Sequence, residues 1–226
     1  MTPSWQIALL FIASYLVGGI PVGLIVSRMK GVDIRQHGSG NYGATNVGRV
    51  LGRKWGVLVL LLDAIKGAST SIGAFPFLAS LGVIVGGMSR DWIWLGTGLS
   101  CVIGNTAPIY LRFKGGKGVA TSLGVIVGIY PYLTLPAAAA LIVWSFSVLT
   151  TKYVSLGSIL AAITVPVSFV ALSWPMEWAL AEHLPLLGLG IAAASVVIFR
   201  HRSNIGRLLS GTEPKIGSGI KSSPQG

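Results

Sequence analysis

Residues 154–174 read VSLGSILAAITVPVSFVALSW and contain no charged side chain. A helix that crosses the hydrocarbon core of a bilayer needs about 20 mostly apolar residues, so this stretch is predicted to be a membrane span. The chain as a whole has the same character: its 226 residues are 52% hydrophobic and 10% charged, whereas ordinary soluble domains are about 25% charged. The sequence therefore predicts an all-α fold, a polytopic bundle of membrane helices.

We expect seven transmembrane helices. The first should bend at Pro21, because proline removes a helix hydrogen bond. Residues 118–150 form one long apolar stretch that is interrupted around Tyr130-Pro131-Tyr132, where a tilted or re-entrant segment would change the count. The expected spans are residues 4–28, 67–88, 92–111, 118–132, 133–150, 154–174 and 183–199.

Positive charge tests this count independently, because Lys and Arg gather in cytoplasmic loops. With seven spans, all of the 17 lysines and arginines except Arg90 fall on one side. This pattern predicts an amino terminus outside and a carboxyl terminus in the cytoplasm. Attraction to anionic lipid headgroups is a second source for the net charge of +11, and we expect no nucleic-acid partner.

We predict a single integral-membrane domain over residues 1–209 and a disordered cytoplasmic tail over residues 210–226, which are rich in Ser, Gly and Pro. Cys101 is the only cysteine, so no disulfide can form within the chain. No cytoplasmic cluster of His, Cys and carboxylates has metal-ligand spacing, so neither a metal nor a cofactor is expected.

Three polar, glycine-containing clusters interrupt the apolar pattern, over residues 37–49, 112–121 and 200–213. All three lie on the inferred cytoplasmic side, so together they make one candidate site. Membrane topology accounts for their cations but not for their neutral polar residues and repeated glycines. Glycine reaches positive φ at little cost, so such loops can direct several backbone N–H groups toward one anion. The candidate phosphate-binding residues are Gly38, Gly40, Asn41, Gly43, Thr45, Asn46, Lys66, Gly115, Gly116, Gly118, Arg207 and Glu213.

Two nucleotide-binding motifs come close to these loops but do not apply. Residues 38–43, GSGNYG, match G-x-G-x-x-G, but that fingerprint requires a preceding strand and a parallel βαβ unit. The second loop, KGGKG at 114–118, lacks the first glycine of a Walker A motif and the Ser or Thr after its second lysine. Nucleoside triphosphate binding is therefore not predicted.

Asp63 and Lys66 are three residues apart and so share one helix face. Because the second span is expected to begin near Gly67, the pair is predicted at the cytoplasmic boundary of the membrane. Two interpretations stay open: a structural ion pair, or a site where Lys66 helps to hold an anionic substrate.

His201, Asn204 and Arg207 follow the last span at three-residue spacing, so on a continuing helix they share one face, with Glu213 near its end. That face could close the site; the alternative is a solvated helix end whose cations favour the membrane surface. The chain has no Gly-x-Ser-x-Gly elbow and no His with an Asp five residues later. Acyl transfer through those arrangements is not predicted.

Together the three clusters resemble the motifs of the bacterial acyl-phosphate-dependent glycerol-3-phosphate acyltransferases, a membrane-integral family of phospholipid biosynthesis. GSGNYGATNVGR at 38–49 resembles the first motif, PIYLRFKGGKGVATS at 108–122 the second, and RHRSNIGRLLSGTE at 200–213 the third. The resemblance implies acyl transfer from acyl phosphate to the 1-hydroxyl of sn-glycerol-3-phosphate, giving lysophosphatidic acid and inorganic phosphate. It also implies seven helices in the bacterial plasma membrane, an active site facing the cytoplasm, and membrane lipids with the two substrates as partners.

By the same resemblance, the catalytic residues are expected to be Ser39, Arg49, Lys117, His201 and Asn204. Arg49 and Lys117 would neutralise two phosphates, while Ser39 and Asn204 would fix their orientation. The general base would be either His201 or a phosphate oxygen of the substrate.

The chain departs from the family pattern at one place, because Gly104-Asn105 stands where the family usually has Gly-His. Asparagine keeps a hydrogen bond but cannot take up a proton. This departure leaves open a paralogue with an altered donor, an altered acceptor or no activity. Two further alternatives stay open apart from it: a transporter or binder of organic phosphates that uses the same basic loops, and a structural or regulatory membrane protein.

Overall fold

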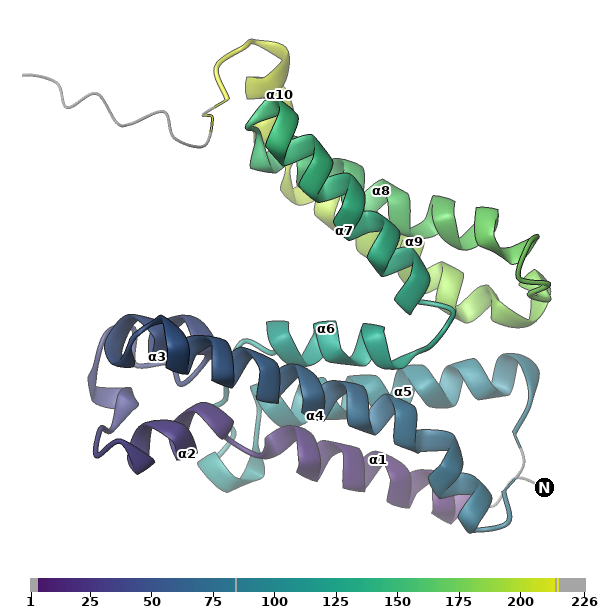
Figure 1. Cartoon of the computed structure of the whole chain (residues 1–226). Coiled ribbons are helices and arrows are strands. Elements are labelled where there is room, and N and C mark those ends of the chain that lie inside the picture. The colour runs from purple at the N-terminus through teal and green to yellow at the C-terminus, as the bar shows by residue number, and fades with distance from the viewer. Residues whose placement is uncertain (1–3, 84, 214, 216–226) are drawn as a thin grey trace, which may run out of the picture. The chain divides into compact units, whose positions relative to one another are not determined.

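The computed structural model describes residues 4–83, 85–213 and 215, and every regular element among them is a helix (Figure 1). The predicted all-α fold is thus confirmed. The α-helices are α1 (Ser4–Gly19), α2 (Val22–Met29), α3 (Ala44–Leu51), α4 (Arg53–Ser80), α5 (Gly87–Thr106), α6 (Val119–Gly128), α7 (Thr134–Thr151), α8 (Val154–Ser173), α9 (Leu184–Arg200) and α10 (Arg202–Leu209). Short 3-10 turns cover Ile34–Gln36, Ile109–Leu111 and Leu180–His183.

Five helical segments among the described residues are long and apolar enough to cross a membrane. Each exposes large apolar side chains, such as Ile72 of α4 and Phe146 of α7, as expected for surfaces that face lipid. The count of seven spans and the orientation of the termini stay predictions. The five segments are Trp5–Met29, Arg53–Ser80, Thr134–Thr151, Val154–Ser173 and Leu180–Phe199.

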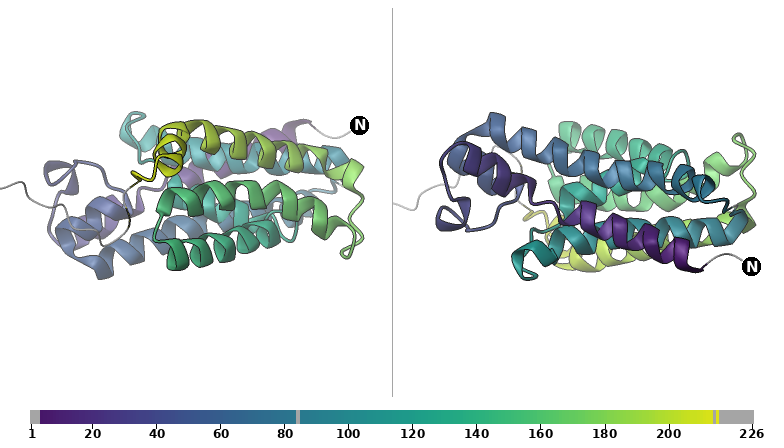
Figure 2. Two further views of the ribbon diagram at one scale, coloured as in Figure 1. Left: turned by 90° about the horizontal axis from the view of Figure 1, so that it is seen from above. Right: turned by 90° about the horizontal axis from the view of Figure 1, so that it is seen from below.

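The chain forms two compact units that divide between Thr134 and Leu135. In the first unit, α1 lies along α5 and α4 lies along α6, with α3 against the start of α4 (Figures 1 and 2). In the second unit, α8 packs on α9, and the short α10 contacts both. Residues 210–213 and 215 of the predicted tail are described, and the rest of that tail lies outside the described residues.

Glycine lets the helices of the first unit approach closely. A Cβ atom on Gly67 of α4 would lie 2.2 Å from the Thr121 carbonyl oxygen of α6, and one on Gly124 of α6 would lie 1.9 Å from the Ala64 carbonyl oxygen. Membrane helices gain little from the hydrophobic effect on association, so close backbone contact supplies much of their packing energy. The α4–α6 pair therefore depends on these glycines.

The first apolar segment breaks where Pro21 was expected to bend it. Helix α1 ends at Gly19 and α2 begins at Val22, with Pro21 as its N-cap residue. The break frees the Ile20 carbonyl oxygen from the regular helix ladder, and this oxygen accepts a hydrogen bond from the Lys66 ammonium at 3.0 Å.

The predicted bounds of the second span were wrong. A turn at Leu81 and Gly82 ends α4 at Ser80, and Gly82 takes the positive φ of 74° that this turn requires. The helix then extends back to Arg53, so Asp63 and Lys66 lie within a helix of 28 residues; their position at the cytoplasmic boundary of the membrane stays a prediction. The third helix is likewise shifted, to 87–106, and the fourth is shorter than predicted, at 119–128.

Replacing Gly67 with alanine should destabilise the first unit, because the new methyl group would overlap the Thr121 carbonyl. We expect a loss of about 1–3 kcal/mol of unfolding free energy, measured by thermal unfolding in detergent. Gly73 of the same helix is the matched control, since a Cβ there meets no atom within 4 Å. A Gly73→Ala variant that loses as much stability as Gly67→Ala would contradict this explanation.

Candidate active site

The first glycine-rich loop is organised around the buried side chain of Asn46. Its Oδ1 atom accepts hydrogen bonds from the Ser39 backbone N–H at 2.9 Å and from Arg49 Nη1 at 3.3 Å, while its Nδ2 atom donates to the His37 carbonyl at 2.9 Å. Gly38 stands at φ 60°, and a Cβ there would lie 2.2 Å from Asn46 Oδ1. The Asn46 side chain thus joins the Ser39 backbone to the Arg49 guanidinium. Position 38 must be glycine because a larger residue there would overlap the Asn46 side chain.

This loop leads directly into helix α3. The Asn41 side chain accepts a hydrogen bond from the Gly43 N–H at 2.8 Å, and Gly43 is the N-cap residue of α3. The unpaired N–H groups at a helix N-terminus carry partial positive charge and favour anions.

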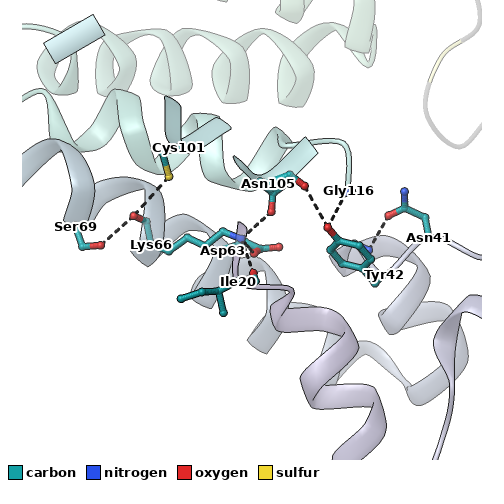
Figure 3. Close-up of polar contacts among 10 residues, drawn as sticks. Ile20, Asn41, Tyr42, Asp63, Lys66, Ser69, Cys101, Asn105 and Gly116 are labelled. Atoms are coloured by element: carbon teal, nitrogen blue, oxygen red, sulfur yellow. Dashed lines mark hydrogen bonds and ion pairs between the residues drawn. The ribbon is translucent and has the colours of Figure 1, made fainter. Parts of the chain in front are cut away.

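Tyr42 connects the first loop to the second. Its buried hydroxyl donates to the Asn105 carbonyl at 3.2 Å and accepts from the Gly116 N–H at 2.9 Å, as Figure 3 shows. Burial raises the pKa of this phenol above its ordinary value, so it stays a neutral donor. The Gly116 N–H also reaches the Asn105 carbonyl, at 3.0 Å.

Both loops line one pocket of about 290 Å³. The first residues of α3 and of α6 lie in its wall, together with Ser39, Arg49 and Lys117. Two helix N-termini and two cations around a small volume make the pocket attractive to phosphate groups. The pocket is lined by Ser39, Asn41, Tyr42, Gly43, Ala44, Thr45, Asn46, Arg49, Leu60, Asp63, Asn105, Gly116, Lys117, Gly118, Val119 and Ala120.

Lys66 lies behind this pocket rather than in its wall. Its ammonium group is 2.8 Å from Asp63 Oδ1, 2.7 Å from Asn105 Oδ1 and 3.0 Å from the Ile20 carbonyl oxygen (Figure 3). The first contact is an ion pair and the other two are hydrogen bonds that the ammonium group donates. This geometry favours the structural ion pair over direct contact between Lys66 and a substrate. Of the other predicted phosphate-binding residues in the first unit, Gly38, Gly40 and Gly115 also lie outside the lining.

The third cluster belongs to the second unit, which is described by itself. The last span does not continue through this cluster as one helix, which was the condition for a shared face, because α9 ends at Arg200 and α10 begins at Arg202. His201 stands between them, with its Nδ1 atom 2.8 Å from the Val197 carbonyl oxygen. The ring orientation is therefore fixed, and the Nε2 atom is the nitrogen available for chemistry.

Glu213 returns to α10 and fixes two of the predicted residues. It accepts hydrogen bonds from Asn204 Nδ2 at 2.8 Å and from Arg207 Nε at 2.7 Å. The Ser155 hydroxyl, the Asn204 amide and the Arg207 guanidinium lower the pKa of this carboxyl to about 2. Glu213 therefore stays ionised at neutral pH. Among the described residues, no group of three or more His, Cys, Asp or Glu side chains is placed to hold a metal ion.

The family is decided by comparison with known proteins. The family model described as glycerol-3-phosphate acyltransferase matches residues 8–211. A glycerol-3-phosphate acyltransferase from Geotalea daltonii is 43% identical over 205 residues, which cover 90% of this chain and 94% of the relative. The chain belongs to the glycerol-3-phosphate acyltransferase family. A relative of the same name from Aquifex aeolicus is 41% identical, with 90% of this chain and 96% of the relative covered.

Two solved structures agree with this membership of the acyltransferase family. Both are of PlsY (YgiH), described as an integral membrane glycerol 3-phosphate acyltransferase, and each is 40% identical to this chain and covers 93% of it. The glycerol 3-phosphate form has a TM-score of 0.61 and is 96% covered, and the lysophosphatidic acid form has a TM-score of 0.60 and is 95% covered. The resemblance that the motifs indicated is thus confirmed.

Sequence reasoning on this acyltransferase missed Tyr42 and did not include Asp63 or Asn105 among the site residues. Tyr42 is the one aromatic residue in GSGNYGATNVGR at 38–49, which is the signal that could have drawn attention to it. Asp63 is the only carboxylate in the pocket wall, and its depth in α4 was hidden by the misplaced span boundary.

Tyr42→Phe should loosen the connection between the two loops, because it removes one donor and one acceptor at a buried position. We expect a loss of about 1–3 kcal/mol of unfolding free energy, measured by thermal unfolding in detergent. Tyr110→Phe is the control, since the Tyr110 hydroxyl is exposed and makes only a 3.3 Å contact with the Leu16 carbonyl. Equal losses in the two variants would rule out a special role for Tyr42.

Proposed function

We propose that this acyltransferase transfers an acyl group from acyl phosphate to the 1-hydroxyl of sn-glycerol-3-phosphate. The observation that carries the proposal is the pocket where two helix N-termini, Arg49 and Lys117 converge. A pocket of this size and charge suits a small phosphorylated alcohol. The solved relative in glycerol 3-phosphate and lysophosphatidic acid forms supports the same acceptor and product.

In the proposed reaction, the glycerol hydroxyl oxygen attacks the acyl carbonyl carbon. The bond between that carbon and the phosphate oxygen breaks, the electron pair leaves with phosphate, and the hydroxyl proton ends on the base or on the departing phosphate. Acyl phosphate is a mixed anhydride with a good leaving group, so no nucleophilic side chain is needed. Positioning and stabilisation of the developing charge can supply most of the acceleration.

Three residues of the pocket can position the substrates and stabilise the developing charge. Arg49 and Lys117 are exposed cations at the pocket and would neutralise the phosphates of acceptor and donor. Ser39, which Asn46 fixes in place, would orient the bound phosphate by a hydrogen bond.

For the third motif, we propose that Asn204 orients substrate and that His201 is one of two candidates for the base. The other candidate is a substrate phosphate oxygen. The proposal draws support from the way Glu213 fixes Asn204 and from the contact between the Val197 carbonyl and one ring nitrogen of His201.

For topology, we propose seven spans in the bacterial plasma membrane, an outside amino terminus and a cytoplasmic active site. The support is the charge asymmetry of the sequence, together with described helices that overlap each of the seven predicted spans. A cytoplasmic site would meet water-soluble glycerol-3-phosphate while the acyl chains of donor and product stay in the bilayer.

Purified protein should make lysophosphatidate from glycerol-3-phosphate and palmitoyl phosphate but not from palmitoyl-coenzyme A. Arg49→Ala and Lys117→Ala should each lower kcat/KM by roughly 100-fold or more, because each removes a cation from the phosphate site. The measurement is release of inorganic phosphate together with radiolabelled product.

Lys114→Ala is the matched control, since Lys114 belongs to the same loop but does not line the pocket. It should keep activity close to that of the unmodified protein. The absence of phosphate release with any acyl phosphate would refute the acyltransferase proposal. Movement of glycerol-3-phosphate across sealed vesicles without turnover would instead establish a transporter.

Topology can be tested with single introduced cysteines, because the native Cys101 is fully buried. Lys54→Cys should be protected from a membrane-impermeant thiol reagent in intact cells, whereas Trp174→Cys should be labelled. Both native side chains are exposed. The reverse pattern would overturn the proposed orientation.

A further inference from the structure

The Asn105 side chain lines the pocket between the two glycine-rich loops but takes no part in the proposed transfer of the acyl group. It is only 4% exposed and lies near the carboxyl end of α5. Its Oδ1 atom accepts a hydrogen bond from the Lys66 ammonium at 2.7 Å. Its Nδ2 atom lies on the side of the glycine loop, where a Cβ built on Gly116 would be 3.3 Å away.

Lys66 fixes which end of the amide faces the pocket. An ammonium group can only donate hydrogen bonds, so it requires the oxygen of Asn105 and excludes the flipped amide. Lys66 cannot turn away from Asn105 without loss, because Asp63 on its own helix and the Ile20 carbonyl after α1 also hold it (Figure 3). The Asn105 NH₂ group is thereby directed toward the pocket.

We propose that Asn105 is a further substrate-binding residue, whose amide N–H donates a hydrogen bond to a phosphate oxygen in the pocket. Lys66 is the positioning residue that orients the amide. The inference rests on the proposed function, because it takes a phosphate group as the ligand. That group belongs either to glycerol-3-phosphate or to acyl phosphate, and the two sources are separated by experiment below.

This role also explains how asparagine can stand where the resemblance leads one to expect histidine. A neutral imidazole offers one nitrogen that accepts and one that donates. It can therefore accept from Lys66 and donate to the pocket, as the amide does. Proton transfer is not needed for this task, and the loss of a titratable group is then harmless.

Asn105→Asp separates binding from a purely structural role. The aspartate keeps an acceptor for Lys66 but replaces the donor with an anionic oxygen. Glycerol-3-phosphate should bind about 10–100-fold more weakly to N105D, as for a lost hydrogen bond to a charged group. N105H should stay within about threefold of the unmodified protein. Affinity is measured by isothermal titration with glycerol-3-phosphate, and KM is measured for each substrate.

A rise in both the dissociation constant and KM for glycerol-3-phosphate would assign the donor to the acceptor substrate. A rise only in KM for palmitoyl phosphate would assign it to the donor substrate. Unchanged values for both in N105D, or an N105H variant as impaired as N105D, would overturn the inference. Ser100→Ala is the control on the same helix, because Ser100 bonds only to the Gly96 carbonyl, and it should leave all values unchanged.

Asn105→Leu is a second test of the inference in case N105D does not fold. Leucine lacks both the donor and the acceptor of the amide, while Lys66 keeps Asp63 and the Ile20 carbonyl as partners. Weaker substrate binding than in the unmodified protein supports the inference, and unchanged binding overturns it. Failure of the proposed function is distinguishable, because protein without acyl transfer would still show weaker glycerol-3-phosphate binding in N105D than in S100A.

Discussion

The first unit depends on one buried cation, the ammonium group of Lys66. A charge inside a membrane protein is costly unless it is paired and its hydrogen bonds are satisfied. Lys66 meets this condition with the carboxylate of Asp63 on its own helix, the amide of Asn105 on α5 and the carbonyl of Ile20 in the break after α1. Three segments far apart in the sequence are therefore held at one point.

This point lies next to the groups that shape the pocket. Asn105 accepts from Lys66 through its side chain and from Tyr42 and Gly116 through its backbone carbonyl. Both glycine-rich loops are thus hydrogen-bonded to the same residue. A rigid frame of this kind matters for a reaction that relies on positioning, because a small misplacement of the phosphates would move the hydroxyl away from the acyl carbon.

The sequence predicted that the helices exist, but it did not predict their exact bounds or the side-chain contacts between distant segments. Apolar runs and the break at Pro21 can be recognised locally, since they depend on composition and on one missing N–H. The bounds of α4 could not be recognised in this way, because a hydropathy window averages over the turn at Leu81 and Gly82. Motif residues such as Arg49 and Lys117 were placed together by topology and family resemblance. The Tyr42 hydroxyl bonds to residues 63 and 74 positions away in sequence, and the Asn105 side chain bonds to Lys66, 39 positions away; no local sequence pattern reports such contacts.

The buried cation of this fold and its exposed cations suit different tasks. Lys66 is buried, ion-paired with Asp63 and hydrogen-bonded to two further segments, so it can hold the surrounding residues in place but cannot follow a substrate. Arg49 and Lys117 are exposed, and water replaces a departing phosphate around them at little cost. In the proposed reaction a phosphorylated alcohol is taken up and inorganic phosphate is released in each turnover, and exposed cations such as Arg49 and Lys117 suit that exchange. The buried cation, Lys66, lies behind them, and its ion pair and hydrogen bonds fix the geometry of the pocket wall.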